Sequence, residues 1–148
     1  MKTLALFLFA ALVVPGLSAA SGPELIGLSY SPGRPLPSDR LEQAVDDGIS
    51  VDRTISHDLG LLRRLPSISF QITGYTDGQE CAAASCQELA LRRAQLFRLA
   101  LIRAGAPTTR ICDVKAQVTP WPSTYQPKQE ELFVGRQVII EPVFDGCA

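Results

Sequence analysis

Alternation between apolar and polar residues is the clearest pattern in this chain, and it indicates strands in three places. The three stretches are residues 68–73, 111–118 and 132–143. In the first stretch Ile68, Phe70 and Ile72 share one face, which is typical of a strand with one buried side. We expect Gly74 to close that strand, and we expect the last strand to end near Pro142.

A period near 3.6 residues replaces the alternation elsewhere and predicts two helices. The stronger pattern covers 87–104, where the apolar side chains form one narrow stripe. This stripe consists of Ala90, Ala94, Phe97, Leu101 and Ala104. Gly105 is expected to end that helix. A second helix is expected over 58–65, with Ser56 as its N-cap and Pro66 directly after its end.

Residues 21–48 are rich in proline, glycine and serine, and the prolines exclude a regular helix there. Within it, 24–30 is a candidate short strand and 41–45 a candidate helical turn. The complete order is then βαβαββ. A strand, a crossover helix and a parallel strand form a right-handed unit. The fold class expected from this order is α+β, with a mixed sheet and two helices packed on one face.

The first twenty residues have the features of a secretory signal peptide. Lys2 supplies a positive charge, 4–14 is an apolar run too short to span a bilayer, and small residues at 18–20 offer a cleavage site. An uncleaved anchor is the alternative interpretation. We expect an exported chain with no membrane span after cleavage. Its predicted parts are a leader (1–20), a Pro/Gly-rich N-terminal segment (21–57) and a folded domain (58–148).

Composition narrows the chemistry further. The 148 residues include 15 acidic and 14 basic ones, and this balance argues against nucleic acid as the main partner. Four cysteines in an exported chain indicate two disulfides. Of the three possible pairings we favour Cys81–Cys86 with Cys112–Cys147, because the first two lie five positions apart. The cysteine spacing is not CxxC and the single histidine, His57, is distant in sequence, so no metal site is expected.

An acid and an arginine flank the predicted loop between the first alternating strand and the long helix. Asp77 lies just past the expected strand end, where α/β layers commonly bind ligands. On a helical wheel Arg93 borders the apolar stripe whereas Arg92 points to solvent, so only Arg93 is placed to converge with Asp77. With the free amides of the helix N-terminus, the pair could hold a carboxylate and an amine. A plain salt bridge between them is the competing interpretation.

Four segments together resemble the OmpA-like peptidoglycan-binding family. They are Gly74-Tyr75-Thr76-Asp77, Leu89-Ala90-Leu91-Arg92-Arg93-Ala94, Ala104-Gly105-Ala106-Pro107 and Gly135-Arg136-Gln137-Val138-Ile139-Ile140. The resemblance covers roughly 58–141 and implies an OmpA-like sandwich. It also implies a periplasmic module that binds peptidoglycan non-covalently, without a cofactor and without catalysis.

The resemblance further implies a ligand site for the diaminopimelate of the peptidoglycan stem peptide. In that family the turn Asp and the Arg before Ala bind its free carboxylate and amine. The candidate ligand-binding residues in this chain are Asp77, Arg93, Thr76, Leu89 and Arg136. Cys86, however, stands where the family usually has an asparagine that lines the site, and the loop between the Asp and the Arg is one residue longer than usual.

These differences leave a second hypothesis open. The chain would then be an interaction module of a cell-envelope complex that keeps the fold and has lost peptidoglycan binding. Trp121, in a proline-rich loop, either packs that loop onto the sheet or anchors a partner protein. An enzyme is not expected, because the sequence assembles no set of nucleophile, base and oxyanion stabiliser.

Overall fold

The structure, a computed structural model, describes residues 24–119 and 135–147. The predicted leader and Trp121 therefore lie outside the described residues. Within the described part of the chain, no helix combines the length and the apolar character needed to cross a membrane.

Four strands form one mixed sheet in the spatial order β1-β4-β2-β3. The strands are β1 (Leu28–Ser29), β2 (Ser69–Asp77), β3 (Lys115–Thr119) and β4 (Gln137–Val143). β2 pairs in parallel with β3 and antiparallel with β4, and β1 pairs antiparallel with β4. The parallel pair requires a crossover connection, which a helix supplies.

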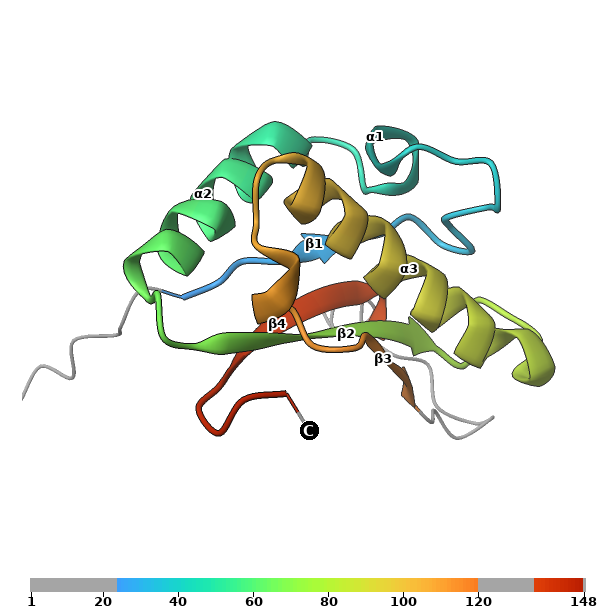
Figure 1. Cartoon of the computed structure of the whole chain (residues 1–148). Helices are drawn as coiled ribbons and strands as arrows, with labels where there is room; N and C mark the ends of the chain where they lie inside the picture. Colours follow the sequence, from blue (N-terminus) through green and yellow to red (C-terminus); the bar gives the residue numbers. More distant parts are fainter. Residues whose placement is uncertain (1–23, 120–134, 148) are drawn as a thin grey trace, which may run out of the picture.

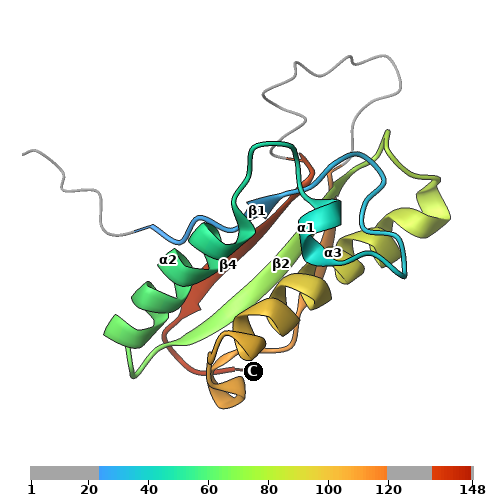
Figure 2. The same ribbon diagram turned by 90° about the horizontal axis from the view of Figure 1, so that it is seen from above.

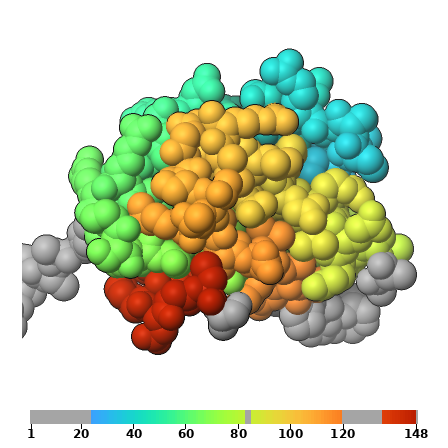
Figure 3. All heavy atoms as spheres, viewed as in Figure 1, coloured from blue at the N-terminus to red at the C-terminus, as the bar shows by residue number. Residues whose placement is uncertain are grey.

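The helices lie on one face of this sheet (Figures 1 and 2). They are α1 (Leu41–Ala44), α2 (Val51–Arg64) and α3 (Ala83–Arg103), followed by a 3₁₀ turn over Thr108–Arg110. In the space-filling view the atoms of α2 (green) and α3 (yellow) lie side by side, with the C-terminal segment (red) below (Figure 3). The α+β class, the mixed sheet and the two long helices on one face are confirmed.

The central strand is longer than its alternation predicts. β2 continues through Gly74 to Asp77, so the expectation that Gly74 closes it is wrong. Residues 70–74 are all buried. β2 lies between β4 and β3, and α3 packs on it. Asp77 is accordingly the last residue of the strand, and it pairs in register with Thr119.

Both long helices begin earlier than predicted. α2 begins at Val51, where the Ser50 side chain accepts a hydrogen bond from the Arg53 amide at 3.3 Å. Ser56 therefore lies inside the helix and is not its cap. α3 begins at Ala83, which makes Arg93 its eleventh residue, well beyond the first turns.

The hydrophobic core includes the N-terminal segment. Its buried side chains come from every layer: Leu28, Tyr30, Leu41, Ala44, Val45, Val51, Ile55, Leu59, Phe70, Ile72, Phe97, Leu101 and Val138. The predicted boundary at residue 58 falls inside α2, and residues on both sides of it share one core. Burial of these apolar side chains is the main stabilising contribution to the fold.

Asp58 links α2 to the chain that leads into β1. Its fully buried carboxylate accepts hydrogen bonds from the amides of Ile26 at 2.9 Å and Gly27 at 3.1 Å. Asp58→Ala would leave these amides without that acceptor, so we expect it to lower the free energy of unfolding by about 2 kcal/mol. Urea denaturation checks this value. Asp52→Ala, at an exposed position of the same helix, should cost about 0.5 kcal/mol, and equal costs for the two variants would contradict the proposed role of Asp58.

Candidate ligand site at the carboxyl end of β2

The candidate site lies where β2 ends and the chain turns toward α3. The Asp77 carboxylate organises this turn, because its Oδ1 accepts hydrogen bonds from the amides of Gln79 and Glu80, both at 2.9 Å. Its Oδ2 lies 3.6 Å from Nε of Arg136, and the Asp77 side chain is only 3% exposed. Gly135 packs against the Asp77 side chain so closely that an added Cβ would lie 2.8 Å from Cβ of Asp77. Asp77 and Arg136, both predicted site residues, are therefore neighbours.

Arg93 is fully buried, deeper than the border position that the helical wheel predicts. Its guanidinium lies over the Tyr30 ring, 5.3 Å from the centroid, and every N–H group donates a hydrogen bond. The acceptors are the carbonyl oxygens of Arg34 (2.8 Å), Tyr75 (2.6 Å) and Ser31 (3.4 Å) and both carboxylate oxygens of Glu80 (2.6 and 2.7 Å). An arginine has five N–H donors in a planar fork, so this environment satisfies the side chain completely.

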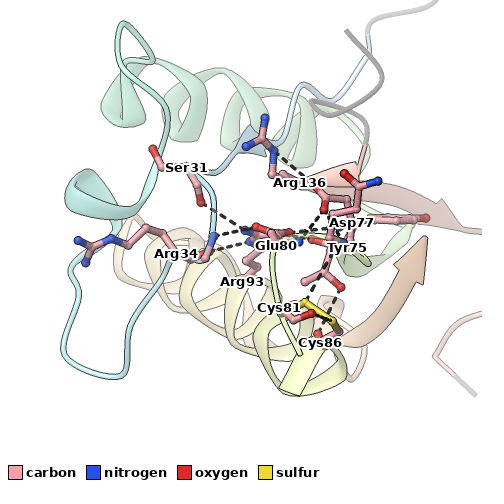
Figure 4. A network of polar contacts seen from close by, with 12 residues as sticks. Ser31, Arg34, Tyr75, Asp77, Glu80, Cys81, Cys86, Arg93 and Arg136 are labelled. Carbon is pink, nitrogen blue, oxygen red and sulfur yellow. Dashed lines mark hydrogen bonds and ion pairs between the residues drawn. A yellow bond between two sulfur atoms is a disulfide. The ribbon is translucent and has the colours of Figure 1, made fainter. Parts of the chain in front are cut away.

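Glu80 is the charge partner of Arg93, although no local pattern in the sequence indicates this role. Its side chain is 2% exposed. Beyond the two bonds from Arg93, its oxygens accept hydrogen bonds from the amides of Gly33 at 2.8 Å and Asp77 at 3.2 Å. Asp77 and Arg93 are thus connected through Glu80, as Figure 4 shows. The competing interpretation of a direct Asp77–Arg93 salt bridge does not describe the structure, in which Arg136 and Glu80 are the respective partners.

The Cys81–Cys86 disulfide follows Glu80 directly and joins the turn to the first turns of α3. The second disulfide joins Cys112 to Cys147, so the pairing is the one that the sequence analysis favours. The Thr76 hydroxyl donates a hydrogen bond to the Cys86 carbonyl at 3.3 Å.

Thr76 and Leu89, the two remaining candidate residues, are buried. Thr76 is adjacent to Asp77 at the end of β2, and Leu89 lies on α3 four residues before Arg93.

Backbone amides contribute to the site, but not those of the α3 N-terminus. Arg93 lies ten residues beyond the helix start, or about 15 Å along the axis at 1.5 Å per residue. The expectation that the first amides of the helix join Arg93 is therefore wrong. The amides that contribute donate to the Glu80 carboxylate, and they belong to Gly33, from the N-terminal segment, and to Asp77.

Two further observations concern the surroundings of Arg93. Burial raises the pKa of the Tyr30 hydroxyl well above its usual value, with the nearby Arg93 charge opposing that shift. Tyr30 therefore stays neutral and donates to the Arg93 carbonyl at 3.1 Å. The helical wheel predicts that Arg92 points to solvent. In the structure Arg92 instead donates to the Pro35 carbonyl at 2.9 Å and to Glu88 at 2.7 Å.

Among the described residues, no group of histidine, cysteine and acidic side chains could hold a metal ion.

Among known proteins, matches to this chain are found in solved structures. No protein-family model matches the chain, and a search of curated proteins finds no match. Solved structures do match. The peptidoglycan-associated lipoprotein of Burkholderia pseudomallei is 16% identical with a TM-score of 0.60, over 86% of this chain and 98% of that one. The C-terminal domain of Helicobacter pylori MotB is 21% identical with a TM-score of 0.53, over 66% and 78%.

A third solved structure, the cell wall anchor of the T6SS from Pseudomonas aeruginosa, is 20% identical with a TM-score of 0.51 and covers 68% of each chain. Identities this low carry information about architecture alone. The chain has the OmpA-like fold.

Proposed function

We propose that this protein is a non-catalytic periplasmic module of the cell envelope that binds peptidoglycan through the diaminopimelate of the stem peptide. One observation supports this above all others. The acid and the arginine of the Gly-Tyr-Thr-Asp and Arg-Arg-Ala motifs meet in one polar cluster with Arg136, in a fold shared with a peptidoglycan-associated lipoprotein and a cell wall anchor.

The chemistry of the cluster suits a ligand that carries both charges. The planar fork of Arg93 pairs with a carboxylate through two parallel hydrogen bonds. Asp77 offers carboxylate oxygens to an ammonium group. Arg136, 11% exposed and beside Asp77, offers a second cation nearer to solvent.

A pelleting assay with isolated sacculi tests the proposal. We expect the wild-type chain to sediment with sacculi and Asp77→Asn to bind at least tenfold more weakly, since a charge-assisted hydrogen bond contributes about 1.5–3 kcal/mol. Asp113→Asn is the matched control, because Asp113 is exposed and lies before the opposite end of β3. If the wild-type chain stays in the supernatant, or if Asp77→Asn sediments as well as the control, the proposed function is wrong.

A second candidate function has a specific observation in its favour. Glu80 occupies both nitrogens of the Arg93 fork, and Cys86 replaces the asparagine that the family uses at the site. An interaction module of an envelope complex that no longer binds peptidoglycan would have these features. A partner protein would then co-purify from an envelope extract, whereas sedimentation of the purified chain with sacculi would contradict this candidate.

A further inference from the structure

The pocket around Arg93 is a complete receptor for a carboxylate, and its occupant is a side chain of the protein itself. Four donors converge on the two oxygens of Glu80: two from the Arg93 fork and the amides of Gly33 and Asp77. A carboxylate offers about four lone-pair directions, so all of them are used. The distances run from 2.6 to 3.2 Å, and the side chain is 2% exposed.

We propose that Glu80 is an internal substitute for the ligand carboxylate. An external carboxylate reaches Arg93 only after the Glu80 carboxylate has left. Glu80 therefore lowers the affinity of the site for an external ligand. This inference rests on the proposed function for the identity of the natural ligand, but the carboxylate receptor itself can be tested separately.

The receptor is built largely from groups other than Glu80. Three backbone carbonyl oxygens, those of Ser31, Arg34 and Tyr75, fix the orientation of the Arg93 guanidinium. The Tyr30 ring lies against it. These contacts come from the N-terminal segment and from β2, on either side of the pocket (Figure 4). Arg93 therefore stays positioned to accept another carboxylate when Glu80 leaves.

The position of Glu80 in the turn gives a ligand a way to displace it. The Glu80 amide is bound by Oδ1 of Asp77, and the Glu80 carboxylate is bound by the Asp77 amide. A ligand ammonium that engages the Asp77 carboxylate competes with the first of these bonds and loosens the turn. The ligand carboxylate can then replace that of Glu80 on Arg93. A ligand with only one charge can either loosen the turn at Asp77 or replace Glu80 on Arg93, but it cannot do both. The arrangement therefore favours a ligand with both charges.

Tethering makes Glu80 a strong competitor. A group held by a short segment acts at an effective concentration on the order of millimolar or higher. The Cys81–Cys86 disulfide, directly after Glu80, restricts the turn further. Removal of the Glu80 carboxylate should therefore increase the affinity for an external ligand at least tenfold.

Acetate tests the receptor without any assumption about peptidoglycan. Glu80→Ala should unfold at a lower temperature than the wild type. Sodium acetate should then raise its midpoint by about 5 °C in a saturable manner, relative to sodium chloride at equal ionic strength. The wild type and Glu88→Ala, an exposed acid of α3, should not respond. If Glu80→Ala does not fold, Glu80→Asp replaces it, because its carboxylate is one methylene too short to reach Arg93. No difference between acetate and chloride would overturn the proposal.

Sacculus binding tests whether Glu80 lowers the affinity for peptidoglycan. We expect Glu80→Gln, which keeps the side-chain volume, to bind sacculi at least tenfold more tightly than the wild type, with Glu88→Gln unchanged. If the wild type binds sacculi, equal or weaker binding by Glu80→Gln overturns the proposal. The two assays separate the possible failures. Acetate stabilisation with no sacculus binding by any variant rejects the proposed function and leaves the receptor. Sacculus binding by the wild type with no acetate response rejects the receptor and leaves the proposed function.

Discussion

Replacing Arg93 with methionine is expected to lower the free energy of unfolding by about 3–5 kcal/mol, because it leaves the buried Glu80 carboxylate without its cation. The substitution also removes the donors to three backbone carbonyls of the pocket. Small domains are stable by only about 5–15 kcal/mol, so Arg93→Met would leave a marginally folded chain. Urea denaturation followed by circular dichroism measures the change.

The neighbouring arginine provides the control. Arg92 lies on the same helix and donates to the Pro35 carbonyl and to Glu88, but its side chain is 26% exposed. Arg92→Met should cost about 1 kcal/mol, because solvent can replace the lost contacts. Equal costs at the two positions would show that the Arg93 pocket does not support the fold.

A double substitution separates the ion pair from the other contacts of Arg93. Glu80→Met combined with Arg93→Met removes both buried charges, and apolar replacements of a buried pair are commonly tolerated far better than removal of one partner. We expect the double variant to regain at least half of the stability that Arg93→Met loses. A double variant as unstable as the sum of both single variants would show that the two side chains are not coupled.

This energetic role affects how binding experiments are interpreted. Any substitution of Arg93 changes folding as well as the candidate site, so lost sacculus binding in such a variant has two explanations. Asp77→Asn is the sharper test, since among the described residues its carboxylate is bound by the turn amides and Arg136. The residue that the family resemblance places at the centre of ligand binding is, in this chain, also a structural residue.

Local signals in the sequence were sufficient for part of this picture. Alternation located β2, helical periodicity located α3, and the short spacing of Cys81 and Cys86 indicated their disulfide. The wheel selected Arg93 over Arg92 as the inward-facing arginine, and the resemblance selected the same residue. These are features that neighbouring residues determine among themselves.

The contacts that complete the site are long-range, and no local pattern contains them. Gly33 and Glu80 are 47 positions apart, and Arg34 and Arg93 are 59 apart. The N-terminal segment has no clear periodicity. Tertiary contacts position it instead, such as the hydrogen bond from the Tyr30 amide to the Arg136 carbonyl. Local sequence does not locate the start of α2 either, because Ser50 and Ser56 can both cap a helix.

Gly74→Ala is expected to lower the free energy of unfolding by about 3 kcal/mol, the upper part of the range for overpacking a core. A Cβ at Gly74 would lie 2.0 Å from the Ala90 carbonyl oxygen and 3.0 Å from the Ala94 amide nitrogen, both backbone atoms of α3. Backbone cannot rotate aside as a side chain can, so the helix itself would have to move away from the sheet.

The consequence of that displacement reaches the site. Arg93 lies three residues after Ala90 on α3, and its Nη1 donates to the Tyr75 carbonyl, one residue after Gly74. A glycine in the strand therefore sets the distance at which the arginine meets its pocket. Gly60→Ala is the matched control, because nothing lies within 4 Å of a Cβ added there on α2; it should raise stability by about 0.5–1 kcal/mol. Urea denaturation of both variants should give changes of opposite sign. A Gly74→Ala variant as stable as the wild type would show that close contact between β2 and α3 does not position Arg93.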